Sequence, residues 1–131
     1  MKLWSKLWKA STQPRKQRKY RANAPLHIRR KLVSAHLSKE LHSKHNMRNI
    51  PIIVGDKVKI ARGSFKNKTG TIEKVDRKDL KVFVSGIENI KKDGSKSLYP
   101  IDPSNVIIIE LKLDDKKRIK SNEDKNGKKS P

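Results

Sequence analysis

A basic segment at residues 61–70, with the sequence ARGSFKNKTG, has residue types and spacing suited to contacts with phosphate groups. Lys66 and Lys68 project from what we predict to be a tight turn, and Arg62 precedes them. Ammonium and backbone N–H groups are common phosphate donors, so the pattern favours RNA contact over lysines that are merely solvated. Phe65 in the same turn either stacks on a base or closes the end of the core, and the sequence leaves both alternatives open.

Three glycines and one asparagine set the expected shape of this turn. Gly55 leads into the strand before it, and Gly63 and Gly70 bracket it, where the backbone needs glycine's conformational freedom or room for close approach. Asn67 lies between them, and asparagine tolerates the left-handed conformation of a tight turn. We therefore predict a strand, a rigid turn and a second strand.

Basic side chains also crowd the start of the chain. The stretch from Pro14 to Tyr20 (PRKQRKY) has no hydrophobic periodicity, so its ordering has to be offset by a partner rather than by burial. We interpret it as an arm that contacts RNA rather than a solvated tail, because guanidinium groups pair bidentately with phosphate and stack on bases. The further candidate RNA-contacting residues are Arg15, Lys16, Arg18, Lys19, Arg21, His27, Arg29, Arg30, Lys31 and Lys39.

The net charge of +21 on 131 residues is divided unequally. Residues 1–50 carry 14 basic and 1 acidic side chains, residues 51–113 carry 13 and 8, and residues 114–131 carry 7 and 4. Leu, Ile, Val and Phe are concentrated in residues 51–113, which hold 22 of them, so we expect the core there. Such a charge excess repels itself unless a polyanion neutralises it, which makes nucleic acid the first candidate partner.

Hydrophobic spacing predicts helices in residues 25–45, either two short ones or one bent one. Pro25 suits a first helical turn, and Ser34 is a candidate N-cap for the second part. The apolar positions of the predicted helical stripe are Ile28, Leu32, Ala35, Leu37 and Leu41.

Beyond residue 50 the pattern changes to a period of two, which predicts half-buried strands. The predicted inward positions are Val58, Ile60, Val82, Val84, Ile107, Ile109, Leu111 and Leu113. Ile72 and Val75 lie three apart, so they share one face only if the strand contains a bulge. Asp93-Gly94 predicts a two-residue hairpin turn in which both residues have positive φ. Short strands with close turns indicate an antiparallel barrel.

Several other functions are disfavoured by the residue inventory. The chain has no cysteine, so it has no disulfide, thiolate zinc site or cysteine nucleophile. It also lacks a nucleophile elbow, a GxxxxGK[ST] loop and an evident carboxylate pair in apolar surroundings, so we expect neither an enzyme nor a cofactor. The spacing of His27, His36, His42 and His45 favours RNA contact or plain surface histidines over a metal site.

The first ten residues, MKLWSKLWKA, place Leu3, Trp4, Leu7 and Trp8 at helical i, i+4 spacing between lysines. Local packing or stacking on RNA is favoured, and membrane-surface binding is a weaker alternative. Lysines interrupt this segment too often for a secretory signal, and the longest apolar run, at residues 106–109, is too short for a membrane span. We expect a soluble cytoplasmic protein.

The stretch from Val54 to Lys78 (VGDKVKIARGSFKNKTGTIEKVDRK) resembles the KOW motif, a small β-barrel module of several ribosomal proteins and of transcription elongation factors of the NusG and Spt5 type. The flanking motifs narrow this resemblance and read PRKQRK, NAPLHIRRK, SAHLSKEL and YPIDPSNV. Together they resemble the ribosomal protein twenty-four family of the large subunit in its archaeal form, related to eukaryotic ribosomal protein twenty-six. The compact spacing from Phe65 to Gly70 and the short C-terminal tail are archaeal features.

This resemblance implies a mainly β fold with N-terminal helices, in which a small SH3-like KOW β-barrel carries an extended basic arm. It divides the chain into a basic arm at 1–22, a helical extension at 23–47, the barrel at 48–113, and a short helix with a disordered tail at 114–131. The short helix is expected at residues 114–120.

The resemblance also implies a structural constituent of the large ribosomal subunit. Such a protein binds rRNA near its 5′ region, acts early in assembly and lies near the peptide exit tunnel. Its partners are rRNA, neighbouring ribosomal proteins and exit-tunnel-associated factors. The alternative is a KOW-containing transcription elongation or RNA-processing factor, although the separate α/β domain usual in such factors is not evident.

Three features depart from the family's pattern. Asn67 stands where relatives usually have glycine, and Asp102 stands where they usually have histidine. A carboxylate facing phosphate repels it, so we expect Asp102 to have a turn or capping role at Pro103-Ser104. The segment at residues 1–10 lies outside the pattern altogether.

Overall fold

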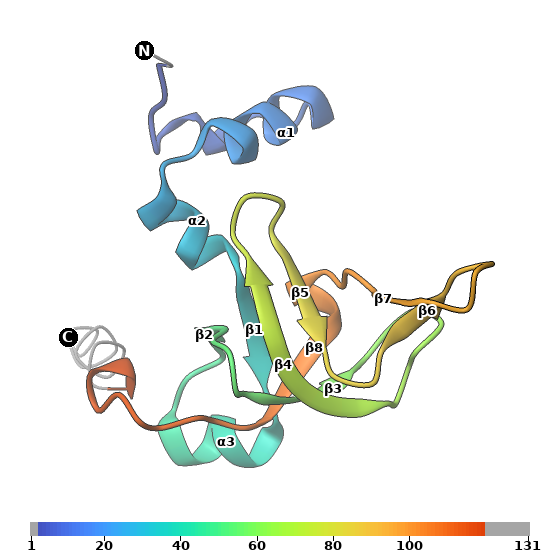
Figure 1. The fold of residues 1–131 in the computed structure, drawn as a ribbon. Helices are drawn as coiled ribbons and strands as arrows, with labels where there is room; N and C mark the ends of the chain where they lie inside the picture. Colours follow the sequence, from blue (N-terminus) through green and yellow to red (C-terminus); the bar gives the residue numbers. More distant parts are fainter. Residues whose placement is uncertain (1–2, 120–131) are drawn as a thin grey trace.

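The computed structural model describes residues 3–119, which form one open sheet, a separate hairpin and short helices (Figure 1). The helices are η1 (Trp8–Ala10), α1 (Pro14–Asn23), α2 (Leu26–Leu32), α3 (Lys39–His45) and η2 (Pro103–Asn105). The strands are β1 (Ser34–Leu37), β2 (Asn49–Pro51), β3 (Lys57–Ile60), β4 (Thr69–Asp76), β5 (Lys81–Val84), β6 (Glu88–Ile90), β7 (Lys96–Leu98) and β8 (Val106–Glu110). Helices α1 and α2 lie beyond one end of the sheet, and α3 lies at the other end.

The six-stranded sheet has the order β2-β1-β8-β3-β4-β5. Its neighbours are antiparallel except for β1 and β8, which pair in parallel, so the prediction of a purely antiparallel arrangement was wrong. No pairing joins β2 to β5 in the described part of the chain, and the sheet is therefore not closed. The fold class is a small β-rich domain with helices.

The core lies where the strand alternation predicted it. Val58 and Ile60 on β3 are buried while the lysines between them are exposed, and Val82 and Val84 on β5 are also buried. They join one cluster of buried apolar side chains. Its other members are Val33, Ala35, Leu37, Met47, Ile50, Ile52, Ile72, Ile87, Ile101, Val106 and Ile108.

The predicted bulge in β4 is confirmed, but the predicted face of the last strand was wrong. The register of β4 against β5 shifts between Ile72 and Lys74, which is the irregularity that the spacing of Ile72 and Val75 requires. On β8 the fully buried side chains are Val106 and Ile108, whereas Ile107 and Ile109 are half-buried. A run of four apolar residues gives no alternation from which to choose a face.

Between α2 and α3 the chain is a strand, not a helix. We predicted a helical stripe through Ala35 and Leu37, but these residues are buried on β1 and pair with β2 and β8. The N-cap of α3 is Ser38 rather than Ser34, and its hydroxyl accepts a hydrogen bond from the Leu41 backbone N–H at 3.4 Å. Alternation over only four residues is indistinguishable from part of a helical repeat, which explains the error.

The stretch interpreted as an arm is a regular helix, α1, which begins with Pro14 at a first-turn position. None of its ten residues is buried. The helix therefore buries no side chain against the sheet, in agreement with the absence of hydrophobic periodicity.

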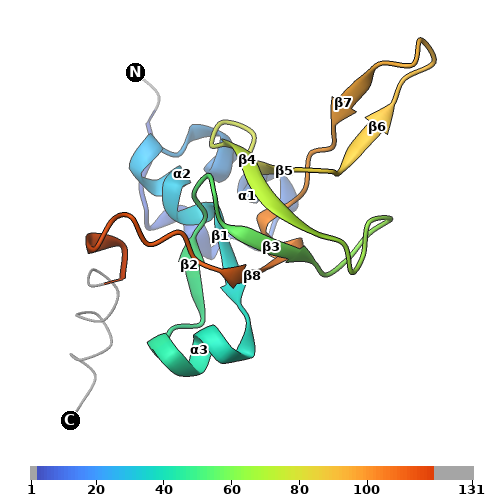
Figure 2. The ribbon, with the colours of Figure 1, turned by 60° about the horizontal axis from the view of Figure 1, so that its bottom comes forward.

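Strands β6 and β7 form a hairpin that projects from the body, as Figure 2 shows. The hairpin prediction is confirmed, but its turn differs from the one predicted. The Gly94 N–H donates to the Lys91 carbonyl at 3.0 Å, and the Lys91 N–H donates to the Ser95 carbonyl at 2.8 Å. Only Gly94 of the Asp93-Gly94 pair has a positive φ, of 86°. The loop is thus one residue longer than the two-residue type.

Residues 117–119 are helical, within the range predicted for a short C-terminal helix. Lys120 and the predicted disordered tail from residue 121 lie outside the described residues. No helix in the described part of the chain has the length and apolar character that crossing a membrane requires.

Candidate nucleic-acid interface

Helix α1 presents basic side chains on an exposed surface. The exposed cations on this helix are Arg15, Lys16, Arg18, Lys19 and Arg21. The helix contains no acidic residue, so no carboxylate on it offsets their charge. A polyanion approaching α1 therefore meets a basic side chain on almost every turn.

Only a few contacts hold α1 in place. The Arg29 guanidinium of α2 donates to the Ala22 carbonyl and, at 3.5 Å, to the Lys78 carbonyl in the β4–β5 turn. The Trp4 indole N–H donates to the Tyr20 carbonyl at 3.1 Å. Arg29 is half-buried by these contacts, so among the predicted RNA-contacting residues it has an evident structural role.

Helix α2 extends the basic surface toward the C-terminal segment. His27, Arg30 and Lys31 are exposed and line a cleft of about 740 Å³. Lys117 and Arg118 line the same cleft from residues 115–118. The cleft brings together cationic side chains from distant parts of the sequence. Lys39 is exposed on α3 and lies at the opposite end of the sheet from α1 (Figure 1).

The turn between β3 and β4 is held by its own backbone hydrogen bonds. The Asn67 N–H donates to the Ile60 carbonyl at 2.8 Å, and the Ile60 N–H donates to the Lys68 carbonyl at 2.9 Å. Asn67 has a φ of 70°, the left-handed conformation expected for it. Arg62, Lys66 and Lys68 are exposed on this turn. The turn thus presents three cations on a fixed backbone.

Phe65 packs within the turn. Its ring lies 5.1 Å from the Tyr99 ring at an interplanar angle of 60°, and it contacts the core cluster. The Lys68 ammonium lies 5.1 Å from the Phe65 ring centroid, within cation–π range. These contacts favour packing over base stacking as the role of Phe65.

The three glycines of the candidate site have separate structural roles. Gly63 has a φ of 97° in open space, and Gly55 has a φ of 99° beside Lys112. A Cβ on Gly70 would lie 2.6 Å from both the Ser85 carbonyl oxygen and a methyl of Val84. Strand β4 can approach β5 at this point only without a side chain.

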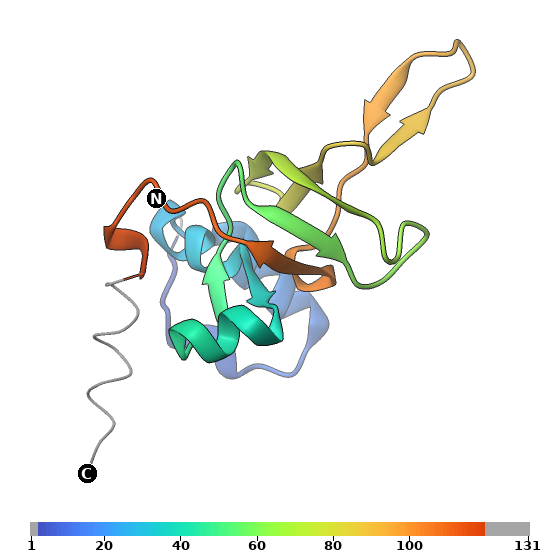
Figure 3. The ribbon, with the colours of Figure 1, turned by 90° about the horizontal axis from the view of Figure 1, so that it is seen from below.

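The structure separates the predicted residues into two groups. Figure 3 shows the β3–β4 turn on the side from which the β6–β7 hairpin projects, away from α1 and α2. We call the first group the helical surface; it comprises Arg15, Lys16, Arg18, Lys19, Arg21, His27, Arg30 and Lys31. We call the second group the loop surface; it comprises Arg62, Lys66 and Lys68.

Asp102 occupies the N-cap position of η2, so the expected turn position is confirmed. Its carboxylate makes no capping hydrogen bond and instead pairs with the Lys81 ammonium. This ion pair compensates a negative charge that would otherwise repel phosphate.

A buried ion pair that the sequence analysis missed connects the C-terminal segment to the sheet. The Arg118 guanidinium donates to both carboxylate oxygens of Asp56, at 2.7 and 2.6 Å, and to the carbonyls of Lys112 and Pro51. Asp56 also accepts from the backbone N–H groups of Ile53 and Lys112. Arg118 belongs to the run KKRIK, in which nothing distinguishes a buried arginine from solvated neighbours.

Two exposed aspartates have pKa values below the ordinary 3.8. Hydrogen bonds from the backbone N–H groups of Asp79 and Lys78 lower the pKa of Asp76 in the β4–β5 turn. The Ser95 hydroxyl and backbone N–H lower the pKa of Asp93 in the β6–β7 turn. Both carboxylates stabilise turns, and neither has a reason to act as a general acid at neutral pH.

Within residues 3–119 no three histidine, cysteine, aspartate or glutamate side chains are arranged to hold a metal ion. The groups that the structure does offer to a ligand are exposed cations, fixed on two helices and on a hydrogen-bonded turn. A β-rich body with these surfaces defines a polyanion-binding protein.

Comparison with known families identifies the polyanion. The family model described as covering eukaryotic ribosomal proteins L26 and archaeal ribosomal proteins twenty-four matches residues 11–125. The match covers most of the chain, and the protein belongs to this family. It is therefore a structural protein of the large ribosomal subunit rather than an enzyme, it has rRNA and ribosomal proteins as partners, and it is located in the cytoplasmic ribosome.

Proposed function

We propose that the protein binds large-subunit rRNA through the helical surface and the loop surface, with the sheet as a rigid support. The observation that carries this proposal is that α1 is helical but buries none of its residues. An isolated helix of ten residues is marginal in water, and side-by-side cations on its surface destabilise it further. Phosphate groups supply the missing stabilisation by neutralising these side chains.

The two surfaces act differently in this proposal. Arginines on α1 and α2 make bidentate contacts with phosphates, and α1 reaches its final position only on RNA because few contacts hold it to the body. The β3–β4 turn docks without rearrangement, since its backbone is already hydrogen bonded. Phosphate contacts fix the orientation of the protein on the folded RNA rather than read a sequence.

The family and the fold support a more specific proposal. We assign the β-rich body to the SH3-like KOW class, with the arm and the helical extension as RNA-binding additions. Binding is proposed near the 5′ region of large-subunit rRNA, early in assembly and close to the peptide exit tunnel, where exit-tunnel-associated factors are further partners. The compact turn from Phe65 to Gly70 supports the archaeal form.

The test is a salt titration of binding to an RNA fragment from the 5′ region of large-subunit rRNA. The logarithm of the association constant should fall linearly with the logarithm of the salt concentration, by about 0.7 to 0.9 for each phosphate contact. A fragment of equal length from the 3′ region is the control and should bind more weakly at every salt concentration. An affinity that does not change with salt would refute the proposal, and equal binding of both fragments would refute the 5′ assignment.

A further inference from the structure

Residues 3–10 fold back on α1, although they lie outside the region that matches the family. The Trp4 ring lies 5.1 Å from the Tyr20 ring at an interplanar angle of 40°, and its indole N–H donates to the Tyr20 carbonyl. The chain then turns into the short helix η1. This segment is therefore docked on α1 through one of its two tryptophans.

A cavity of about 360 Å³ lies between this segment and α1. Its volume is within the range of about 300 to 1,000 Å³ typical of small-molecule sites. The lining residues that matter here are Leu3, Trp4, Leu7, Trp8, Lys16 and Lys19. Leu3, Leu7 and Trp8 remain 84, 74 and 57 % exposed. Trp8, unlike Trp4, keeps much of its ring available to a ligand.

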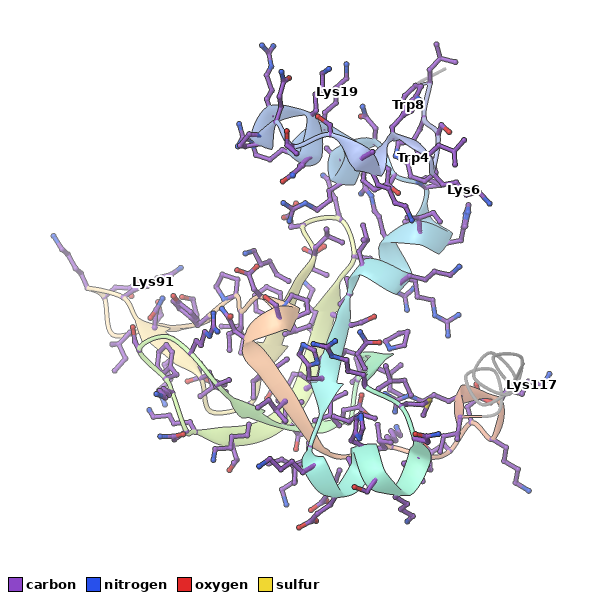
Figure 4. The ribbon with its side chains drawn as sticks, turned by 180° about the vertical axis from the view of Figure 1, so that it is seen from behind. Trp4, Lys6, Trp8, Lys19, Lys91 and Lys117 are labelled. Atoms are coloured by element: carbon purple, nitrogen blue, oxygen red, sulfur yellow. The ribbon has the colours of Figure 1, made fainter. Side chains whose placement is uncertain are left out.

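The charges around the cavity select an anionic occupant. Lys16 and Lys19 line it from α1, Lys6 and Lys9 are exposed on the docked segment, and no acidic residue precedes Glu40 in the sequence. Figure 4 shows Trp4, Trp8, Lys6 and Lys19 grouped around α1, away from the sheet. An exposed aromatic ring beside cations is the combination that binds unpaired nucleotides, because bases stack on the ring while phosphates pair with the cations.

We propose that this cavity holds an unpaired nucleotide of an RNA strand, with its base stacked on Trp8 and its phosphates paired with Lys16 and Lys19. The inference rests on the proposed function for its partner, RNA, but adds a stacking site beyond the region shared with the family. A membrane surface fits less well. Interfacial segments present a continuous apolar helix face, whereas here η1 has three residues and Trp4 is tied to Tyr20.

The two tryptophans of the chain are both at this site, so intrinsic fluorescence reports on it alone. The variants Trp4→Phe and Trp8→Phe each leave a single reporter. We expect single-stranded oligoadenylate to quench Trp8 in the Trp4→Phe variant, and duplex RNA of equal length to quench it less because paired bases cannot stack on a side chain. Trp4 in the Trp8→Phe variant should be quenched much less, since its ring already packs on Tyr20.

Affinity for oligoadenylate gives a second readout. Trp8→Ala should weaken binding about 5-fold or more, in line with the effect of removing one stacked aromatic side chain. Its salt dependence should stay unchanged, because no phosphate contact is lost, while Trp8→Phe should retain most of the affinity. Leu26→Ala is the matched control: it removes an equally exposed apolar side chain that does not line the cavity, and binding should not change.

The outcomes separate this inference from the proposed function. Salt-sensitive binding of RNA without quenching of Trp8, and with unchanged affinity in Trp8→Ala, would overturn the nucleotide site and leave the proposed function standing. A wild-type protein that binds no RNA would overturn both. Vesicles of phosphatidylglycerol and phosphatidylcholine should leave Trp8 emission unchanged at physiological salt. A blue shift with these vesicles, together with no quenching by RNA, would assign the cavity to a membrane instead.

Discussion

Arg118 and Asp56 form an ion pair from which water is almost excluded. Asp56 is fully buried and Arg118 is 8 % exposed, and the carboxylate receives two backbone N–H groups as well as the bidentate guanidinium. A buried charge of this kind is tolerated only while its partner and its hydrogen bonds are present. The pair therefore fixes the path of the chain after β8 against the loop before β3.

Replacing Arg118 with methionine should lower the free energy of unfolding by about 3 to 5 kcal/mol, because the Asp56 carboxylate stays buried without its counterion. Urea denaturation measures this change. Lys57→Gln is the matched control, since the Lys57–Glu110 pair is 3.0 Å long but about half exposed at each side chain, and its loss should cost about 1 kcal/mol or less. Equal effects of the two substitutions would show that Arg118 is not buried in solution.

At the level of elements, α1 is separable from the body. It buries none of its own residues, and it is attached through the Arg29 guanidinium and the Trp4–Tyr20 contact. The buried cluster begins only after α2, at Val33. The sheet thus has no need of α1 for its own stability.

Deleting residues 1–23 should leave the sheet folded while it weakens rRNA binding, since eight basic and no acidic side chains are lost. The salt dependence should become shallower by about 0.7 to 0.9 for each phosphate contact removed. Circular dichroism and urea denaturation monitor the fold, and a salt titration monitors binding. A full-length variant with all five α1 cations replaced by glutamine should reproduce most of the binding loss, and an unfolded truncation would contradict this division of the chain.

The β6–β7 turn depends on an ionised carboxylate. Asp93 has a pKa below its ordinary 3.8, so it stabilises the folded turn fully above 3.8, and this contribution is lost as the pH falls through the lower folded pKa. Ser95→Ala removes the hydroxyl that is the main cause, and the pKa of Asp93 should rise toward 3.8. Carboxyl NMR titration measures it. The pKa of Asp76, lowered by a different turn, should not move.

The elements that sequence patterns predicted are those in which one local pattern determines the fold. Strands β3 and β5 alternate strictly, and the spacing of Ile72 and Val75 required a bulge, so all three features were predicted correctly. Strand β1 was not, because its burial arises from β8, which lies far away in sequence, and no local pattern encodes such pairing.

The candidate site was predictable in its residue types but not in its arrangement. Runs of arginine and lysine identified the basic helices and the turn. Two features depended on tertiary contacts that spacing does not contain. These are the intramolecular role of Arg29 and the burial of Arg118 among other cations of its run.

For the molecule as a whole, salt acts in opposite directions on stability and on binding. The net charge of +21 repels itself in the free protein, and the screening length falls from about 10 Å at 0.1 M salt to about 3 Å at 1 M. RNA binding weakens over the same range because fewer counterions are released.

The midpoint of thermal unfolding of the free protein should therefore rise with sodium chloride, by about 4 °C for each kcal/mol of repulsion that is screened. Calorimetry at several salt concentrations measures it. The variant with five glutamines on α1 should respond less, because it starts with a smaller excess of charge. A midpoint that falls with salt in both proteins would show that ion pairs, rather than repulsion, dominate.

Strand β8 lies between β1 and β3 in the sheet but comes last of the strands along the chain. Until β8 has been synthesised, β1 with β2 and β3 with β4 and β5 are two half-sheets, each with an exposed edge where the missing strand belongs. Unpaired edges of this kind recruit strands from other chains. During its synthesis the protein is thus most exposed to mispairing just before completion, and the arrival of its last strand turns two fragments into one folded body.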